Sequence, residues 1–302
     1  MSRSRVLVAF LAASLCALTA RPAPAQNAPI LDAISTVDFS HGPSILKVGS
    51  WVKYHLTAQS EKGVTDDYTV TVMIAGEEEW WGEECFWVET TTQRGEGGSE
   101  TAATLMSTAI FDDSLAARHV LLYQRKRISE LDEHNKPRQQ TIRRGDSALK
   151  SRTPPDPGIT VRVDSLGTDT LNTVLGTLPC RKVRTEQGVG STAQSADSSQ
   201  YTEERDVRVI YLSSRIPVTG RAREEIDYSI KRRTWLTGRS QDSGPLRVMD
   251  RSKGTLELVA CGTGGVEAAY VPVEFRRSLA EQRAAQAPRS RVPAAKPRPR
   301  AH

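Results

Sequence analysis

The chain has 302 residues, of which 38% are hydrophobic and 25% are charged, and its formal net charge is +5. The basic excess lies at the two ends, since residues 1–25 and 276–302 together hold 11 of the 41 basic side chains and one of the 36 acidic ones. Residues 26–275 therefore carry 30 basic and 35 acidic groups, which argues against a basic core that binds nucleic acid.

The N-terminus has the three-part layout of a cleavable secretory signal. Arg3 and Arg5 make a basic start, and residues 6–20 form an uncharged apolar run. Residues 23–25 (Ala-Pro-Ala) supply the small side chains that a signal peptidase needs. The apolar run is shorter than the roughly 20 residues of a membrane span. We therefore expect residues 1–25 to be a signal peptide and the mature protein to be periplasmic or extracellular and soluble, with an uncleaved anchor as the alternative.

Short segments of alternating apolar and polar residues follow, which is the pattern of strands with one buried face. The first three are residues 50–56, 67–74 and 85–91. Turns at Gly63 and Gly76 separate them. Connections this short favour an antiparallel meander.

A second group of strand-like segments follows a proline-rich break at residues 144–158. The clearest segments are 159–163, 173–184, 207–212, 226–236 and 254–259. We interpret residues 187–200, which are rich in Gly, Ser, Ala and Gln, as a flexible hairpin loop. Residues 102–111 suit either a helix or a strand, and residues 119–128 favour a strand.

These segments predict a mostly β, antiparallel fold with minor helix, with an α+β fold as the alternative. The two groups of strands either share one core or form two stacked halves that meet near residue 150. The expected organisation is a signal peptide (1–25), a linker (26–44), a β-rich domain (45–275, with halves 45–143 and 159–275) and a disordered basic tail (276–302).

Three cysteines remain after removal of the signal peptide, and an exported compartment permits a disulfide. Cys85 and Cys180 lie in strand-like segments, and Cys261 lies beside a glycine turn. We therefore expect a Cys85–Cys180 bridge, with three buried thiols as the alternative. No Cys-x-x-Cys or Cys/His cluster occurs, so we expect no metal site and no cofactor.

The sequence contains none of the common motifs of serine hydrolases, zinc proteases or nucleotide-binding loops. Residues 261–265 (Cys-Gly-Thr-Gly-Gly) suit a nucleophile or a phosphate site, but a strand-end turn explains the glycines better. We therefore predict no catalytic residue. A hydrolase without a recognisable motif is the least favoured function.

Two adjacent tryptophans, Trp80 and Trp81, lie among five glutamates in residues 77–84. We interpret the glutamates as a solvated hairpin tip, because they lack the spacing of a calcium loop. Neighbouring side chains on a strand point to opposite faces, so one tryptophan is expected to be exposed as a binding platform. Trp51 and Trp87 complete the candidate surface for a ligand or partner; packing against neighbouring loops is the alternative.

Three segments of the first half carry a resemblance to a known group of proteins: residues 49–54 (GSWVKY), 72–78 and 85–89 (CFWVE). They resemble bacterial exported β-rich proteins of unknown function, which are similar to the periplasmic lipoprotein-sorting carriers. Residues 176–180 and 216–220 match the later half of the same group. The resemblance implies a curved, half-barrel-like antiparallel sheet with an apolar concave face, partly covered by helices. None of the matching positions is a catalytic signature.

The favoured function is a non-enzymatic exported binding protein that holds a lipid, another apolar ligand or a protein partner on its curved sheet. A scaffold of the cell envelope is the alternative. The tail, residues 276–302, has eight basic side chains and one acidic one, so it suits salt-sensitive contact with an anionic surface. A purely solubilising tail explains it equally well. The sequence predicts no specific nucleic-acid partner and no particular oligomeric state.

Overall fold

The structure is a computed structural model that describes residues 46–63, 65–95, 97–113, 122–131, 134, 136–141, 159–195, 197–236 and 244–286. The expected signal peptide, linker and proline-rich break lie outside these residues. Within them, no helix is both long and apolar enough to span a membrane.

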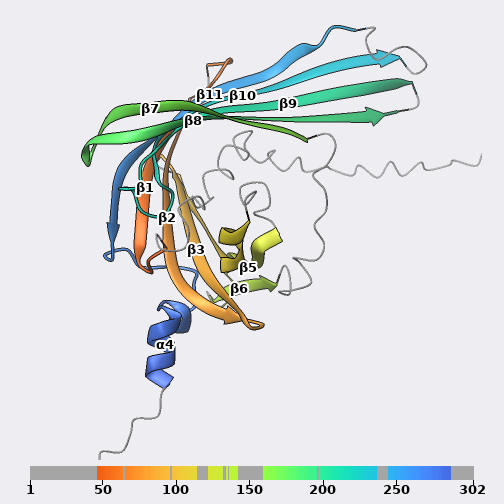
Figure 1. The fold of residues 1–302 in the computed structure, drawn as a ribbon. Helices are drawn as coiled ribbons and strands as arrows, with labels where there is room; N and C mark the ends of the chain where they lie inside the picture. The colour runs from red at the N-terminus through yellow and green to blue at the C-terminus, as the bar shows by residue number, and fades with distance from the viewer. Residues whose placement is uncertain are drawn as a thin grey trace, which may run out of the picture. The chain divides into compact units, whose positions relative to one another are not determined.

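Eleven antiparallel strands form one sheet (Figure 1). The strands are β1 (Ser50–Ser60), β2 (Thr65–Trp80), β3 (Glu83–Arg94), β4 (Ser99–Ser107), β5 (Gln124–Leu131), β6 (Pro137–Thr141), β7 (Ile159–Thr173), β8 (Gly176–Gln194), β9 (Ser198–Leu212), β10 (Arg221–Leu236) and β11 (Arg247–Thr263). The helical elements are the 3₁₀ helices η3 (Thr108–Asp112) and η5 (Val273–Phe275) and the helix α4 (Leu279–Gln286). The predicted mostly β fold with minor helix is confirmed.

The strand order is β6-β5-β4-β3-β2-β1-β11-β10-β9-β8-β7, so the first and last strands pair in the middle of the sheet. The pairing of β1 with β11 runs from Ser50↔Thr263 to Ser60↔Ser252. The two groups of strands are therefore two meanders that lie side by side in one sheet. The two groups thus share one continuous sheet through the edge-to-edge pairing of β1 with β11.

Alternation along β1 gives the sheet two different faces. Val52, Tyr54 and Leu56 have no exposed surface, and we name their side of the sheet the first face. Trp51 and Lys53 are half-buried and lie on the other side, which we name the second face. Burial of each large apolar side chain contributes about 1.5–3 kcal/mol to folding, so the first face accounts for much of the stability of β1.

A β-bulge between Ile74 and Gly76 interrupts the pairing of β2 with β3. Bulges bend a strand and increase its twist, and both strands curve along their length in Figure 1. Gly76 is also a point of close approach, because a Cβ atom there would lie 1.8 Å from the backbone oxygen of Phe275. A glycine at the bulge thus lets the C-terminal part of the chain lie against β2.

That C-terminal part, residues 264–286, packs on the second face, and we name it the C-terminal strap. The carboxylate of Glu89, which is 3% exposed, accepts the backbone N–H groups of Ala269, Tyr270 and Val271 at 2.7, 2.8 and 3.2 Å. The strap also closes an apolar cluster on this face, whose buried members are Met73, Ala75, Cys85, Trp87, Ala103, Leu105, Ile128, Ala268 and Val271. The strap is therefore part of the core.

Helix α4 ends the strap (Figure 1), and hydrogen bonds to Glu77 fix it to β2. The Glu77 side chain accepts the N–H of Leu279 at 2.7 Å, and its backbone oxygen accepts from the Gln282 side chain at 2.8 Å. Ser278 and Glu281 exchange hydrogen bonds as a capping box, which lowers the pKa of Glu281. The expectation of disorder from residue 276 is therefore wrong for residues 276–286. The end of the tail, residues 287–302, lies outside the described residues.

The segment interpreted as a flexible loop, residues 187–200, is instead mostly strand, because β8 continues to Gln194 and β9 begins at Ser198. The glycines of this segment make room for side chains of neighbouring strands and do not indicate a flexible loop. A Cβ atom at Gly190 would lie 2.8 Å from the hydroxyl of Tyr201.

The expected Cys85–Cys180 disulfide is not formed, and Cys85, Cys180 and Cys261 are all free. Cys85 lies in β3 and Cys180 in β8, and five strands separate β3 from β8 in the sheet. At about 4.8 Å per strand this is roughly 30 Å along the sheet, whereas a disulfide needs Cα atoms within about 7 Å. Burial of Cys85 and Cys180 agrees with the alternative, in which the thiols pack as small apolar groups.

The close approach at Gly76 predicts that Gly76→Ala displaces the C-terminal strap. The added methyl group meets backbone and has nowhere to go, so we expect a loss of about 3 kcal/mol and rapid proteolysis between residues 264 and 286. Gly98→Ala is the matched control, because a Cβ atom there meets nothing within 4 Å. Urea unfolding and limited proteolysis measure both. Equal stability and equal cleavage of the two variants would contradict the proposed contact.

Candidate functional site

The four candidate tryptophans differ widely in exposure. Trp87 has no exposed surface, Trp51 and Trp80 are half-buried, and Trp81 is 60% exposed. Trp51 lies against Gly262, and its indole N–H donates to the backbone oxygen of Gly264 at 2.8 Å. Trp51, Trp80 and Trp87 thus belong to the apolar cluster under the strap, and Trp81 presents its indole to solvent.

Trp81 and Gly82 form the two-residue turn between β2 and β3, and their φ angles are 53° and 81°. Two positive φ values are typical of the type I′ hairpin turn, which favours Asn-Gly. A bulky L-residue in the left-handed region costs roughly 1–2 kcal/mol. Strain of this kind is concentrated at functional sites, so the exposed Trp81 is a candidate contact residue.

The glutamates beside the turn differ in exposure: Glu79 and Glu84 are exposed, as the sequence predicted for a solvated tip, whereas Glu78 is buried. Glu78 lies on the second face and is 4% exposed. It accepts the indole N–H of Trp87 at 3.1 Å and forms an ion pair with Lys126 of β5. The solvated interpretation is therefore wrong for Glu78.

Lys126 is enclosed by aromatic rings as well as by Glu78. Its ammonium nitrogen lies 3.7 Å from the centroid of the Trp80 ring and 5.7 Å from that of Phe275 in the strap. A cation over an aromatic face is attracted by the ring's quadrupole, more strongly when water is excluded. The tip of the β2–β3 hairpin, residues 77–84, is thus held in place by both the ion pair and the aromatic contacts of Lys126. Sequence reasoning missed Lys126 because nothing in its segment indicates a partner on β2.

The more exposed acids of the tip pair with arginines. Glu79 and Glu84 share Arg283 of α4, whose Nη2 lies 3.1 and 3.2 Å from their carboxylate oxygens. Glu83 pairs with Arg125, whose Nε lies 2.6 Å from Oε2. Trp81 therefore protrudes from a hairpin whose acidic side chains pair with arginines near or within α4 and β5.

A second polar cluster lies on the first face around Glu224, which has no exposed surface. Its two carboxylate oxygens pair with Arg208 and Arg221, each at 2.8 Å. Nearby, the Tyr54 hydroxyl bonds Thr219 and donates to the backbone oxygen of Arg221, and burial raises the pKa of Tyr54. The charges of this cluster are satisfied within the protein, so we assign it a structural role.

The cysteines are poor nucleophiles in this structure. Burial, followed by the charge of Glu83, raises the pKa of Cys85 to about 12, and burial also raises the pKa values of Cys180 and Cys261. The thiolate is the reactive form of cysteine, and it is scarce at neutral pH when the pKa is raised. Across the described ranges, no group of three or more His, Cys, Asp or Glu side chains is placed to hold a metal ion.

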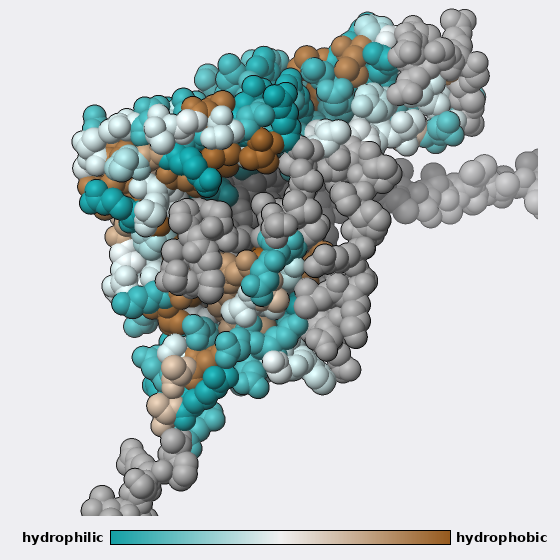
Figure 2. Space-filling model, viewed as in Figure 1, coloured by the Kyte–Doolittle hydropathy of each residue, from teal (hydrophilic) through white to brown (hydrophobic). Residues whose placement is uncertain are grey.

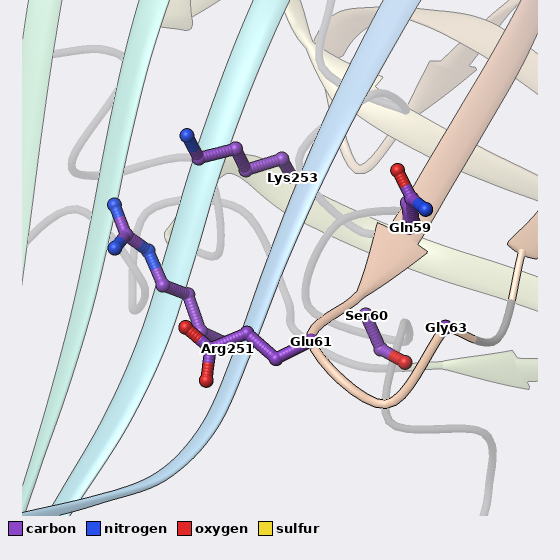
Figure 3. A pocket seen from close by; sticks show the side chains of 6 residues that line it. All are labelled: Gln59, Ser60, Glu61, Gly63, Arg251 and Lys253. Atoms are coloured by element: carbon purple, nitrogen blue, oxygen red, sulfur yellow. The ribbon is translucent and has the colours of Figure 1, made fainter.

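Two open recesses are lined by polar residues, charged residues and glycines. One of about 380 Å³ lies between β1, the turn after it and β11 (Figure 3) and is lined by Gln59, Ser60, Glu61, Gly63, Arg251 and Lys253. The other, of about 360 Å³, is lined by Thr65, Asp66, Asp67, Arg94, Gly95 and Gly97. On the side seen in Figure 2, hydrophobic residues are interspersed with hydrophilic ones along the long strands.

Comparisons with known proteins find no matching family model and no matching curated protein. Three solved structures are similar to this chain at low identity. A protein described as a lipoprotein from Parabacteroides distasonis has a TM-score of 0.32 and 10% identity, over 75% of this chain and 99% of that one. An exported protein with a YmcC-like fold from Bacteroides fragilis has a TM-score of 0.28 and 11% identity, over 72% and 97%.

The third structure is a LolA superfamily protein from Nitrosomonas europaea, with a TM-score of 0.23 and 10% identity, over 79% of this chain and 93% of that one. Because these TM-scores lie below 0.5, the function proposed below rests on this chain's own residues.

The difference between Trp81 and Trp87 predicts opposite responses to substitution. Trp81→Asn relieves roughly 1–2 kcal/mol of left-handed strain and loses an edge-to-face contact with Trp80 worth about 0.5–1.5 kcal/mol. We therefore expect its unfolding free energy to stay within about 1 kcal/mol of the original. Trp87→Phe removes the indole donor from Oε2 of Glu78 and opens a void, so it should cost about 2–4 kcal/mol. Urea unfolding measures both, and equal losses would place Trp81 in the core.

The ion pair between Lys126 and Glu78 predicts a strong coupling between the two residues. Lys126→Met leaves a buried carboxylate without its counter-charge and should cost about 3–5 kcal/mol. Adding Glu78→Gln should restore most of that loss, because the uncompensated charge is then gone. Lys253→Met, at an exposed position on β11, is the control and should change stability by less than about 0.5 kcal/mol. A double-mutant cycle of the Lys126→Met and Glu78→Gln substitutions that gives no coupling energy would refute the pairing of Lys126 with Glu78.

Proposed function

We propose that the chain is an exported, non-enzymatic binding protein of the cell envelope, and that it contacts its partner through the β2–β3 hairpin tip. The observation that carries this proposal is Trp81, 60% exposed at a φ of 53° on a hairpin fixed by Lys126 and α4. Tryptophan is enriched at binding hot spots because it offers a large, rigid contact area. A rigid mount reduces the entropy lost on binding.

Protein-partner binding is better supported than transport of an apolar ligand. The first-face residues Val52, Tyr54 and Leu56 are completely buried, so they offer no open apolar surface. The residues that line the two recesses described above are polar, charged or glycine. The paired charges around Glu224 and the raised pKa of Cys85 likewise give no support to a hydrolase. An envelope scaffold remains compatible with the same tip, since a scaffold also needs a partner surface.

Export is supported by the N-terminal pattern alone: the basic start, the apolar run at residues 6–20 and the Ala-Pro-Ala of residues 23–25. A protein exported by such a signal works in the periplasm or outside the cell. A partner would then be another component of the envelope.

Site-specific photo-cross-linking in the native cell tests the proposal. A benzoylphenylalanine at position 81 keeps an aromatic ring at the tip and should give a covalent adduct with a partner protein. The same residue at Val163 on β7, which is 61% exposed, is the control for random collisions. An adduct at position 81 and none at position 163 is expected. Equal labelling at positions 81 and 163 would mean that the tip is not the binding surface. A lipid adduct at position 81 would favour a carrier of an apolar ligand.

A further inference from the structure

The hairpin tip already binds cationic side chains in two different ways. Arg283 lies between the carboxylates of Glu79 and Glu84, at 3.1 and 3.2 Å. The ammonium of Lys126 lies on the face of Trp80, 3.7 Å from the ring centroid. Paired carboxylates and an indole face are the groups that recognise arginine and lysine. Trp81 extends the same surface, with its ring edge-to-face against Trp80 at 5.8 Å.

The chain also carries a segment of matching chemistry that begins close to this tip. Residues 287–302 directly follow α4 and contain no acidic residue. Their basic side chains are Arg289, Arg291, Lys296, Arg298 and Arg300. Four prolines, at positions 288, 293, 297 and 299, are interspersed with them. Proline-rich segments favour the extended polyproline II conformation, which docks on exposed aromatic rings at a low cost in entropy.

The distance along the chain allows the contact. Arg283 touches Glu79 and Glu84, and Arg289 follows six residues later, within about 20 Å of extended chain. A segment tethered this closely has an effective concentration on the order of millimolar. A weak contact is therefore enough to keep it on the tip for much of the time.

We propose that the tip is a docking site for the chain's own arginine- and proline-rich segment, residues 287–302, which lies against Trp81 and competes there with the external partner. The guanidinium groups bind the indole face of Trp81 and the carboxylates of Glu79 and Glu84. This inference rests on the proposed function, because it assigns the same tip an internal competitor. It implies that partners of the tip carry a similar basic, extended segment.

Fluorine NMR of the full chain labelled with 5-fluorotryptophan tests the contact. The Trp81 resonance is assigned by its loss in Trp81→Phe. The test variant replaces five basic residues with glutamine: Arg289, Arg291, Lys296, Arg298 and Arg300. The matched control removes five exposed charges elsewhere: Lys47, Arg162, Arg181, Arg247 and Lys253. These substitutions leave the tip itself unchanged.

The Trp81 resonance should shift in the tail variant, and high salt should move the resonance of the original chain to the same position because it screens the contact. The buried Trp87 resonance and the control variant should stay unchanged. An unmoved Trp81 resonance in the tail variant, or an equal shift in the control, overturns the inference. If the resonance stays fixed while position 81 still cross-links a partner, the docking fails and the proposed function stands. If the Trp81 resonance moves while no partner is captured, the docking stands and the proposed function fails.

Discussion

The pairing of β1 with β11 is the constraint on which the rest of the structure depends. It joins the first strand of the chain to the last along the whole length of β1. The chain therefore leaves β11 beside the start of β1, where Gly264 donates its N–H to the backbone oxygen of Gly49 at 2.8 Å. From that point the strap is already at the second face of β1–β3. Had β11 paired at an outer edge of the sheet, the strap would emerge far from Glu89 and Gly76.

Buried carboxylates then fix the position of the strap and of the tip. Glu89 binds three backbone N–H groups, Glu78 pairs with Lys126, and Glu224 pairs with two arginines. A buried charge without partners is strongly destabilising, whereas a compensated one adds little net stability. Their effect is therefore mainly on specificity: any other position of the strap or of β5 would leave Glu89 or Glu78 unpaired. The exposed Trp81 contacts Trp80, and Glu79 and Glu84 on either side of its turn pair with Arg283 of α4.

The sequence predicted what depends on local pattern. Alternation in residues 50–56 identified β1 correctly, and the adjacent Trp80 and Trp81 were expected to differ in exposure, as they do. Prediction from the sequence failed where contacts between distant segments determine whether a residue is buried or a segment is ordered. The acidic character of residues 77–79 indicated solvent, but Lys126 buries Glu78. The composition of the tail indicated disorder, but Glu77 and a capping box order α4. The glycines at 188 and 190 indicated a loop, but they make room for side chains of neighbouring strands.

The central claim is that the tip is a rigid platform because the strap is a folded part of the core. Hydrogen–deuterium exchange of the full chain tests it most directly, at the amides of Ala269, Tyr270, Val271 and Leu279, which bond to Glu89 and Glu77. These amides should exchange as slowly as those of β2 and β3, since opening them requires unfolding of the second-face cluster. Exchange at the rate of an unstructured chain would contradict the claim, because the tip would then have no fixed support.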